Sequence, residues 1–192
     1  MLSGVKRGFL TAFIVVMISV MACGANAAEF KADMTMGSDT AGEMTGRVFV
    51  KGNALRQELD TPAGPQVTII EQNAKVMYVI LPGQKMYMEI QNNQITLDED
   101  ENIEAKLAEE GTVTKKGTED IEGYTCDVYH IVYNDSSYGE STVWISKDLN
   151  YPLTVYMESP QDTVTILYTN IEENNVDPAL FKLPSGYTKF SM

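Results

Sequence analysis

Cys126 and His130 are the residues whose types could support catalysis, because a thiol next to an imidazole base is the arrangement of a cysteine nucleophile. They stand four residues apart in a segment that is typical of a β-strand. There they would share a face but lie roughly 13 Å apart, at about 3.3 Å per residue, whereas proton transfer needs about 3 Å. A serine or threonine nucleophile would need a second histidine, and the chain has one His and no G-x-S-x-G turn. The sequence therefore predicts that the protein is not an enzyme.

A calcium loop is the next chemistry that the residue types suggest. Asp98, Asp100, Asn102 and Glu109 stand at positions 1, 3, 5 and 12 of the calcium-loop template. Position 6 of that template is a glycine, which allows its sharp turn, and here it is Ile103. The same residues are better explained as the start of a helix, so we predict no dedicated calcium site.

Two pairs of methionines offer softer metal ligands. Met34 and Met36 share one face of a predicted strand, as do Met86 and Met88, and the thiol and imidazole named above could join them in binding Cu(I). Residues two apart on a strand are separated by about 6.6 Å, which methionine side chains can bridge. Flexible thioethers also fill apolar interiors and adapt to irregular apolar ligands. Cu(I) binding is therefore kept as an alternative, and the favoured interpretation assigns the chain no metal and no cofactor.

The composition excludes several classes of function. The chain has 192 residues, of which 44% are hydrophobic and 21% charged, which is enough apolar material for one folded domain. Its formal charge of −13 argues against binding nucleic acid, whose phosphates need clustered Lys and Arg, and against docking on anionic lipid. One His and two Cys cannot build a His-rich or four-Cys zinc site.

Residues 1–27 have the features of a secretory signal peptide. Lys6 and Arg7 precede an apolar run from Phe9 to Ala22, and Ala25-Asn26-Ala27 fits the cleavage signal. The run is shorter than the roughly 18 residues that span a bilayer. We therefore expect a periplasmic protein with no transmembrane span in its mature chain, and residues 28–192 as a single β domain.

The mature chain would differ from the full sequence in two ways. Loss of Lys6 and Arg7 leaves 12 of the 14 basic residues against all 27 acidic ones. Cys126 becomes the lone thiol, so no intramolecular disulfide can form. In an alternative reading, a weaker match to a lipobox would place the cut before Cys23 and leave a membrane-anchored lipoprotein.

Short strand-like runs separated by turn residues fill the rest of the chain. The first group of predicted strands comprises Phe30–Met36, Gly46–Lys51, Leu55–Leu59, Val67–Gln72, Lys75–Leu81 and Lys85–Ile90. The second group comprises Thr112–Lys116, Tyr124–Tyr133, Ser141–Ser146, Leu153–Glu158 and Thr163–Ile171. About eleven strands joined by short links predict one mainly β, antiparallel sheet, sandwich or barrel.

One segment between the two groups is expected to be helical. Residues Asp98–Glu110 are rich in helix formers, and Asp98 with Glu101 resembles a capping box. The apolar stripe of this helix consists essentially of Ile103 and Leu107, so it should lie over another element rather than form the core. A second short helical turn is predicted at Asp177–Leu180.

Several predicted strands are apolar on both faces, which requires a cover on each side. In the fifth strand, one face carries Val76, Tyr78 and Ile80, and the other carries Met77, Val79 and Leu81. Closure of the sheet, a helix or a ligand could provide the cover. At such a strand, both faces are apolar, so alternation alone does not show which face lines the interior.

The order of these segments resembles the bacterial outer-membrane lipoprotein carrier (LolA/LolB-like) superfamily, most closely its uncharacterised single-domain exported relatives. The segments that carry the resemblance are Gly46–Lys51 followed by a two-residue turn and Leu55–Glu58, the hairpin from Val67 through Met77-Tyr78, Gly123–Tyr129, Val143–Asp148, and a closing D-x-x-x-F-x-x-P-x-G pattern at Asp177–Gly186. The resemblance implies an open antiparallel half-barrel with a short helical lid. Its concave face would receive lipid or lipoprotein acyl chains. An envelope sensor or interaction domain on the same scaffold, with a protein partner on an edge strand, is the alternative.

The resemblance also suggests which residues would act. We expect the ligand-binding lining to come from Met34, Met36, Tyr78, Ile80, Met86, Met88, Trp144 and Val155, with Ile103 and Leu107 on the lid. Shielding of acyl chains from water would contribute about 0.8 kcal/mol per buried methylene. The carrier latches its lid with a basic residue followed by proline, but the corresponding turn here is Gly52-Asn53, so Arg56 is the nearest candidate latch.

Overall fold

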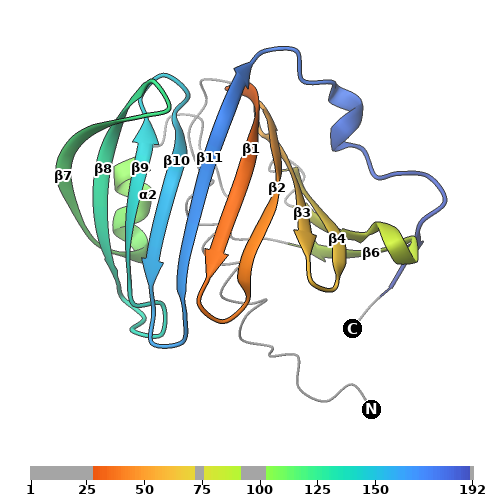
Figure 1. Ribbon diagram of the computed structural model, residues 1–192, viewed down its shortest axis with the longest axis horizontal. Coiled ribbons are helices and arrows are strands. Elements are labelled where there is room, and N and C mark those ends of the chain that lie inside the picture. The colour runs from red at the N-terminus through yellow and green to blue at the C-terminus, as the bar shows by residue number, and fades with distance from the viewer. Residues whose placement is uncertain (1–27, 72–75, 92–102, 191–192) are drawn as a thin grey trace.

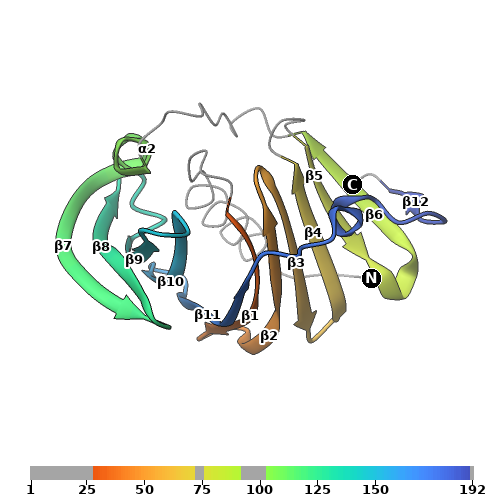
Figure 2. The same cartoon turned by 90° about the horizontal axis from the view of Figure 1, so that it is seen from above.

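The computed structural model describes residues 28–71, 76–91 and 103–190, which form one curved sheet of twelve strands (Figures 1 and 2). The strands before the helix are β1 (Glu29–Ser38), β2 (Gly42–Lys51), β3 (Ala54–Thr61), β4 (Gly64–Glu71), β5 (Val76–Leu81) and β6 (Met86–Gln91). The strands after it are β7 (Gly111–Ile121), β8 (Tyr124–Tyr133), β9 (Glu140–Ser146), β10 (Tyr151–Glu158), β11 (Thr163–Glu173) and β12 (Thr188–Lys189). The open antiparallel half-barrel expected from the sequence is thereby confirmed.

The order of the strands in the sheet is β12-β6-β5-β4-β3-β2-β1-β11-β10-β9-β8-β7. It consists of two meanders, and β11 lies between β1 and β10 and joins them. Neighbouring strands are antiparallel apart from β12, which runs parallel to β6. All eleven predicted strands are present. The twelfth was not predicted, because two residues bound through backbone groups carry no sequence pattern.

Alternation of polar and apolar residues explains why these segments form half-buried strands. In β1, every second residue from Phe30 to Ser38 is buried and the residues between them are half-buried. The same alternation continues in β3. Strand β7 is longer than the predicted Thr112–Lys116, because Gly117 does not end it: a bulge between Lys115 and Gly117 absorbs the irregularity, and pairing with β8 continues to Ile121.

The helical elements are short. Helix α2 spans Ile103–Glu110, so the helix predicted between the two strand groups is present there, while residues 98–102 of that prediction lie outside the described residues. A 3₁₀ turn η2 covers Pro82–Gln84. The turn predicted near residue 177 is η3 (Pro178–Phe181), whose first turn is capped by the Asp177 carboxylate accepting from the Ala179 N–H at 2.9 Å. None of the described helices has the length and apolar character that crossing a membrane requires.

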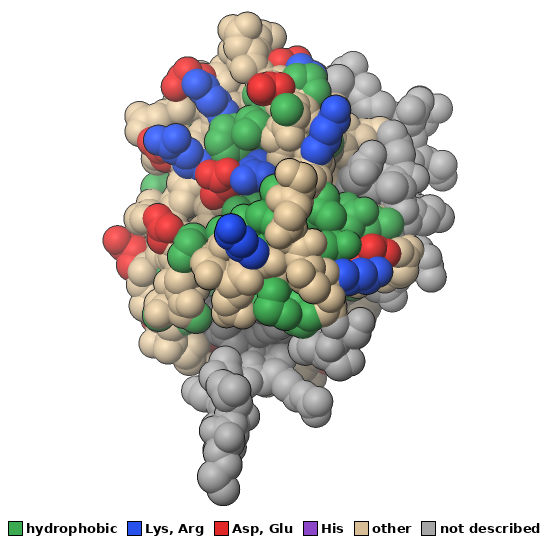
Figure 3. Space-filling model, turned by 90° about the vertical axis from the view of Figure 1, so that its right-hand side faces the viewer, with side chains coloured by type: hydrophobic (Ala, Val, Ile, Leu, Met, Phe, Trp, Pro, Cys, Tyr) green, Lys and Arg blue, Asp and Glu red, His purple; other side chains and the backbone are tan. Residues whose placement is uncertain are grey.

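The C-terminal segment, residues 177–190, covers the outer face of β4, β5 and β6. It packs on a second apolar cluster formed by Val67, Ile69 and Ile80, to which it contributes the half-buried Phe181, Leu183 and Tyr187. This cover explains why β5 is apolar on both faces. Figure 3, which looks at this side, shows apolar side chains among acidic and basic ones.

A buried hydroxyl and a carboxylate tie the β1–β2 turn to the β10–β11 turn. Ser38 donates to Asp162 at 2.6 Å, and the Thr40 hydroxyl and N–H donate to the same carboxylate at 2.9 and 3.1 Å. Partial burial acts to raise the pKa of Asp162, but these hydrogen bonds outweigh it and lower the pKa below its ordinary value. The ionised form of Asp162 therefore stabilises the folded protein.

We expect Asp162→Asn to lower the free energy of unfolding at neutral pH by about 1–2 kcal/mol, as for hydrogen bonds to a charged group. Because the folded pKa is depressed, the stabilisation is fully present above the ordinary aspartate pKa of about 4 and is lost as the pH falls through the folded value. Urea unfolding of both proteins between pH 7 and pH 3 should show the difference shrinking at the acid end. Asp39→Asn, at an exposed carboxylate in the same β1–β2 turn, is the control, and an equal loss there would contradict the assignment.

Candidate functional site

Figure 2 shows that the sheet is curved. Its inner side, called here the concave face, is lined by a large apolar cluster. Inward residues of neighbouring strands lie directly opposite one another. From β9 to β2, one such row consists of Val143, Val155, Ile166, Met36 and Met44. From β1 to β6, another consists of Phe30, Val50, Leu55, Ile70, Met77 and Ile90. Along these two rows, the apolar surface extends across both meanders.

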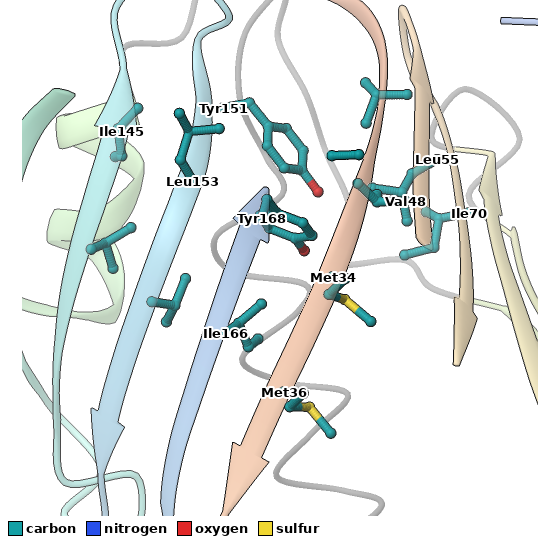
Figure 4. Packing of buried hydrophobic residues seen from close by; sticks show 14 of the residues in the cluster. Met34, Met36, Val48, Leu55, Ile70, Ile145, Tyr151, Leu153, Ile166 and Tyr168 are labelled. Carbon is teal, nitrogen blue, oxygen red and sulfur yellow. The ribbon is translucent and has the colours of Figure 1, made fainter. Parts of the chain in front are cut away.

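Three aromatic rings occupy the middle of the concave face. Tyr151 lies edge-on to Phe30, with ring centroids 5.1 Å apart, and edge-on to Tyr168 at 5.7 Å. In Figure 4, both tyrosines lie beside Met34 and Val48 on the inner side of the strands. Burial raises the pKa of Tyr168 to about 12, with a smaller opposing effect from Tyr151. The Tyr168 hydroxyl is therefore protonated and can donate a hydrogen bond at neutral pH.

One amide interrupts the apolar lining. Gln57 of β3 is only 3% exposed and lies opposite Val48 and Thr68. Its Nε2 donates to the Met34 sulfur at 2.7 Å, and a thioether is a weak acceptor. Gln57 was not predicted from the sequence. Its position midway between Leu55 and Leu59, which share one face of β3, could have indicated that it is buried.

Four of the predicted lining residues lie in the main apolar cluster: Met34, Met36, Met88 and Val155. Met86 lies two residues before Met88 on the same face of β6. It pairs with Leu81 of β5 and is half-buried.

The remaining predicted lining residues lie elsewhere. Ile80 and Tyr78 belong to the second cluster under the C-terminal segment, on the opposite face of β5 from Met77 and Val79. Strand alternation puts Trp144 on the opposite face from Val143 and Ile145. It packs only on the margin of the main cluster, and its indole N–H donates to Glu119 at 2.8 Å.

The predicted lid residues lie on helix α2, which Figure 2 shows at the β7 side of the mouth of the concave face. Ile103 is the first residue of the helix, and Leu107 is buried in the main cluster. Arg56 does not reach this helix. Its guanidinium binds Glu58 at 2.7 Å and donates to the Leu180 carbonyl at 2.9 Å. Arg56 therefore fastens the C-terminal segment to the outer face, because its alternation on β3 points it away from the concave face.

Charged side chains gather at the β7–β9 end of the concave face. Asp127, opposite Ile145, binds Lys115 at 2.8 Å and Lys147 at 3.3 Å. Partial burial acts to raise the pKa of Asp127, but the two lysines outweigh it and lower the pKa. The Lys115 ammonium also lies 5.5 Å from the centre of the Tyr129 ring. This end of the face is polar, in contrast to the uncharged centre.

The structure separates the residues considered for catalysis and for metal binding. Cys126 pairs with Ser146 and His130 pairs with Thr142, so they stay four residues apart on a regular ladder. Burial raises the pKa of the Cys126 thiol to about 11, which leaves little thiolate at neutral pH. The two methionine pairs lie on β1 and β6, five strand spacings or about 24 Å apart along the sheet. Within the described ranges, no group of three His, Cys, Asp or Glu side chains could hold a metal ion. Three of the four residues of the calcium-loop template, Asp98, Asp100 and Asn102, lie outside those ranges.

Comparison with known proteins places the chain in a fold and in a family. Residues 30–163 match the family described as Domain of unknown function (DUF4412). No curated protein matches. Among solved structures, the chain is similar to an uncharacterized conserved protein from Thermus thermophilus, with 11% identity, a TM-score of 0.59, and 96% of this chain and 99% of that chain covered.

Two further structures are informative about the architecture. The Pseudomonas aeruginosa MucA/MucB complex matches with 11% identity and a TM-score of 0.53, and 91% of this chain aligns with only 61% of that chain. A LolA superfamily protein from Nitrosomonas europaea is also found, with 11% identity, a TM-score of 0.40, and 88% of this chain and 97% of that chain covered. At 11% identity, the similarity to the Thermus thermophilus protein and to the MucA/MucB complex establishes the fold alone. The function is therefore inferred from the concave face.

Proposed function

The chain belongs to the family described as a domain of unknown function (DUF4412), whose pattern its residues 30–163 match, and we propose that it is a binding protein that holds lipid or lipoprotein acyl chains on its concave face. The leader-like residues 1–27 support export, so the proposed location is the periplasm. The mechanism is shielding of hydrocarbon from water, with no covalent step.

A single observation carries this proposal: rows of apolar side chains cross the concave face from β6 to β8. The rows extend through ten strands, β1–β6 and β8–β11. Among the described residues of helix α2, Leu107 is the buried side chain that joins this cluster. An apolar surface of this extent suits an apolar ligand, since burial of further apolar area is worth about 25 cal/mol per Å². Methionines at Met34, Met36, Met44, Met77, Met88 and Met157 line it. Their flexible thioethers suit chains of varied length and unsaturation.

A matched pair of variants on one strand tests the proposal. Met36 is buried on the concave face and Thr35, its neighbour, points to the outer face. We expect Met36→Gln, which keeps the side-chain length but adds an amide, to weaken binding of an acyl-chain fluorescent probe about tenfold, because about 1.4 kcal/mol of apolar contact is lost. Thr35→Gln should leave the affinity unchanged. Equal effects of the two variants, or no probe binding by the wild type, would sink the proposal.

A protein partner from the envelope is the second candidate function. MucB, which shares this fold, is described in complex with MucA. In this chain, Val132, Tyr156 and Leu167 are the large apolar side chains exposed on the described surface. Glu140 lies opposite Val132, and Glu158 accepts from the Tyr156 hydroxyl at 3.3 Å. These groups favour a partner with apolar and basic residues. Because they lie on the outer face, such a partner could bind while the concave face holds a ligand.

A further inference from the structure

We propose that Gln57 and Tyr168 form a polar recognition point in the middle of the concave face, which selects acyl ligands that carry a neutral carbonyl group, an ester or an amide, over plain hydrocarbon and over ionised fatty acid. The inference rests on the proposed function, because it names the chemistry that the concave face would recognise in its ligand.

Burial of the Gln57 amide carries a free-energy cost. A buried amide without good partners destabilises a protein by about 1–3 kcal/mol. For Gln57, the hydrogen bond to the Met34 sulfur is the one that the described residues provide, and its Oε1 has no partner among them. Leucine would fill the same volume at this inward position of β3 without that cost. A group that approaches from the concave side can satisfy both the second amide hydrogen and the amide oxygen.

Tyr168 is a neighbour of the same methionine. Tyr168 lies directly opposite Met34 in the β1–β11 ladder, and Met34 is the residue that Gln57 contacts. Gly46, the other cross-strand neighbour of Met34, has no side chain to separate Met34 from β3. Met34 thus contacts Gln57 and pairs with Tyr168, and both of these neighbours are buried. Figure 4 shows Met34 and Tyr168 together on the inner side of the strands.

The absence of charge around Gln57 and Tyr168 among the described residues decides the class of ligand. One row across this place consists of Tyr168, Met34, Gly46, Leu59 and Gln66, and the next consists of Ala32, Val48, Gln57, Thr68, Val79 and Met88. None of these residues is charged, and the lysines of the concave face lie at its β7–β9 end. A carboxylate buried here would have no cationic partner and would pay a large desolvation cost. A neutral carbonyl accepts from the amide and the phenol without that cost, and an amide can also donate to the Gln57 oxygen.

The test compares three ligands with one chain length in a displacement assay against an apolar fluorescent probe: hexadecane, methyl palmitate and palmitamide, with palmitate added at neutral pH. The variant is Gln57→Leu, and Leu55→Met on the same face of β3 is its control. Differences in ligand solubility cancel when each variant is compared with the wild type for the same ligand. Tyr168→Phe, which removes only the hydroxyl, gives a second variant that keeps the ring packing.

We expect Gln57→Leu to weaken methyl palmitate and palmitamide about tenfold while leaving hexadecane within a factor of two, with a smaller loss of the same kind for Tyr168→Phe. Leu55→Met should change all ligands alike. Equal effects of Gln57→Leu on ester and alkane, or wild-type protein that prefers palmitate to its methyl ester, would overturn the recognition point and leave the acyl-binding function standing. Failure of all four ligands to displace the probe from wild-type protein would overturn both.

Discussion

Gly46→Ala should destabilise the protein by about 3 kcal/mol, at the upper end of overpacking costs. A Cβ atom at this position of β2 would collide with the backbone carbonyl oxygen of Glu58, and it would lie 3.0 Å from that carbonyl carbon and 3.1 Å from the Leu59 Cα. These are backbone atoms of the neighbouring strand, so no side chain can rotate away. Strands β2 and β3 would therefore have to move apart near Met34 and Gln57.

Gly37→Ala is the matched control, because it lies on the adjacent strand β1 and a Cβ there meets nothing within 4 Å. It should be neutral or stabilise by up to about 1 kcal/mol, since alanine reduces the freedom of the unfolded chain. Thermal unfolding would show Gly46→Ala melting roughly 6–12 °C below the wild type, at about 2–4 °C per kcal/mol for a domain of this size. Identical melting of the two alanine variants would show that β2 and β3 do not approach so closely.

A chain that ends after Val176 should lose most of its stability and aggregate. Removal of residues 177–192 exposes the cluster of Val67, Ile69 and Ile80 and uncovers the edge of β6. Fully exposing three such aliphatic side chains costs about 1.5–3 kcal/mol each, which is comparable to the total stability of roughly 5–15 kcal/mol for a typical domain. An uncovered edge strand also offers a template for pairing with other chains.

The soluble yield and the urea midpoint of the truncated and full-length chains measure this effect. Val176 is retained because it is buried and its carbonyl accepts from Lys51 at 3.0 Å. Lys189→Ala in the full-length chain is the control, since it removes only the surface ion pair with Glu89, and surface ion pairs contribute little to stability. A truncated chain with the midpoint of the full-length protein would mean that the C-terminal segment contributes nothing to the stability of β4–β6.

The sequence predicted the strands well because alternation is a local signal, as the ladder from Phe30 to Ser38 illustrates. It predicted the site less well, because the face on which a residue lies depends on what covers the other face. Tyr78 and Ile80 were expected on the concave side, and nothing local to β5 showed that Phe181, about a hundred residues later, would pack on them. The contact of Arg56 with the Leu180 carbonyl depends on the same distant segment. Gln57 escaped attention because a glutamine on a strand is usually solvated.

The position of β11 has a consequence for how the protein comes into being. This strand is the last of the long strands in the chain, yet it is the central one that joins β1 to β10. The two meanders can each form as they emerge from a ribosome or a translocation channel, but they cannot combine until Glu173 has followed. Pairing the first strand with the last long one closes a loop of more than a hundred residues, a slow step in chains rich in such contacts. The strand order therefore delays completion of the sheet until the chain is nearly finished.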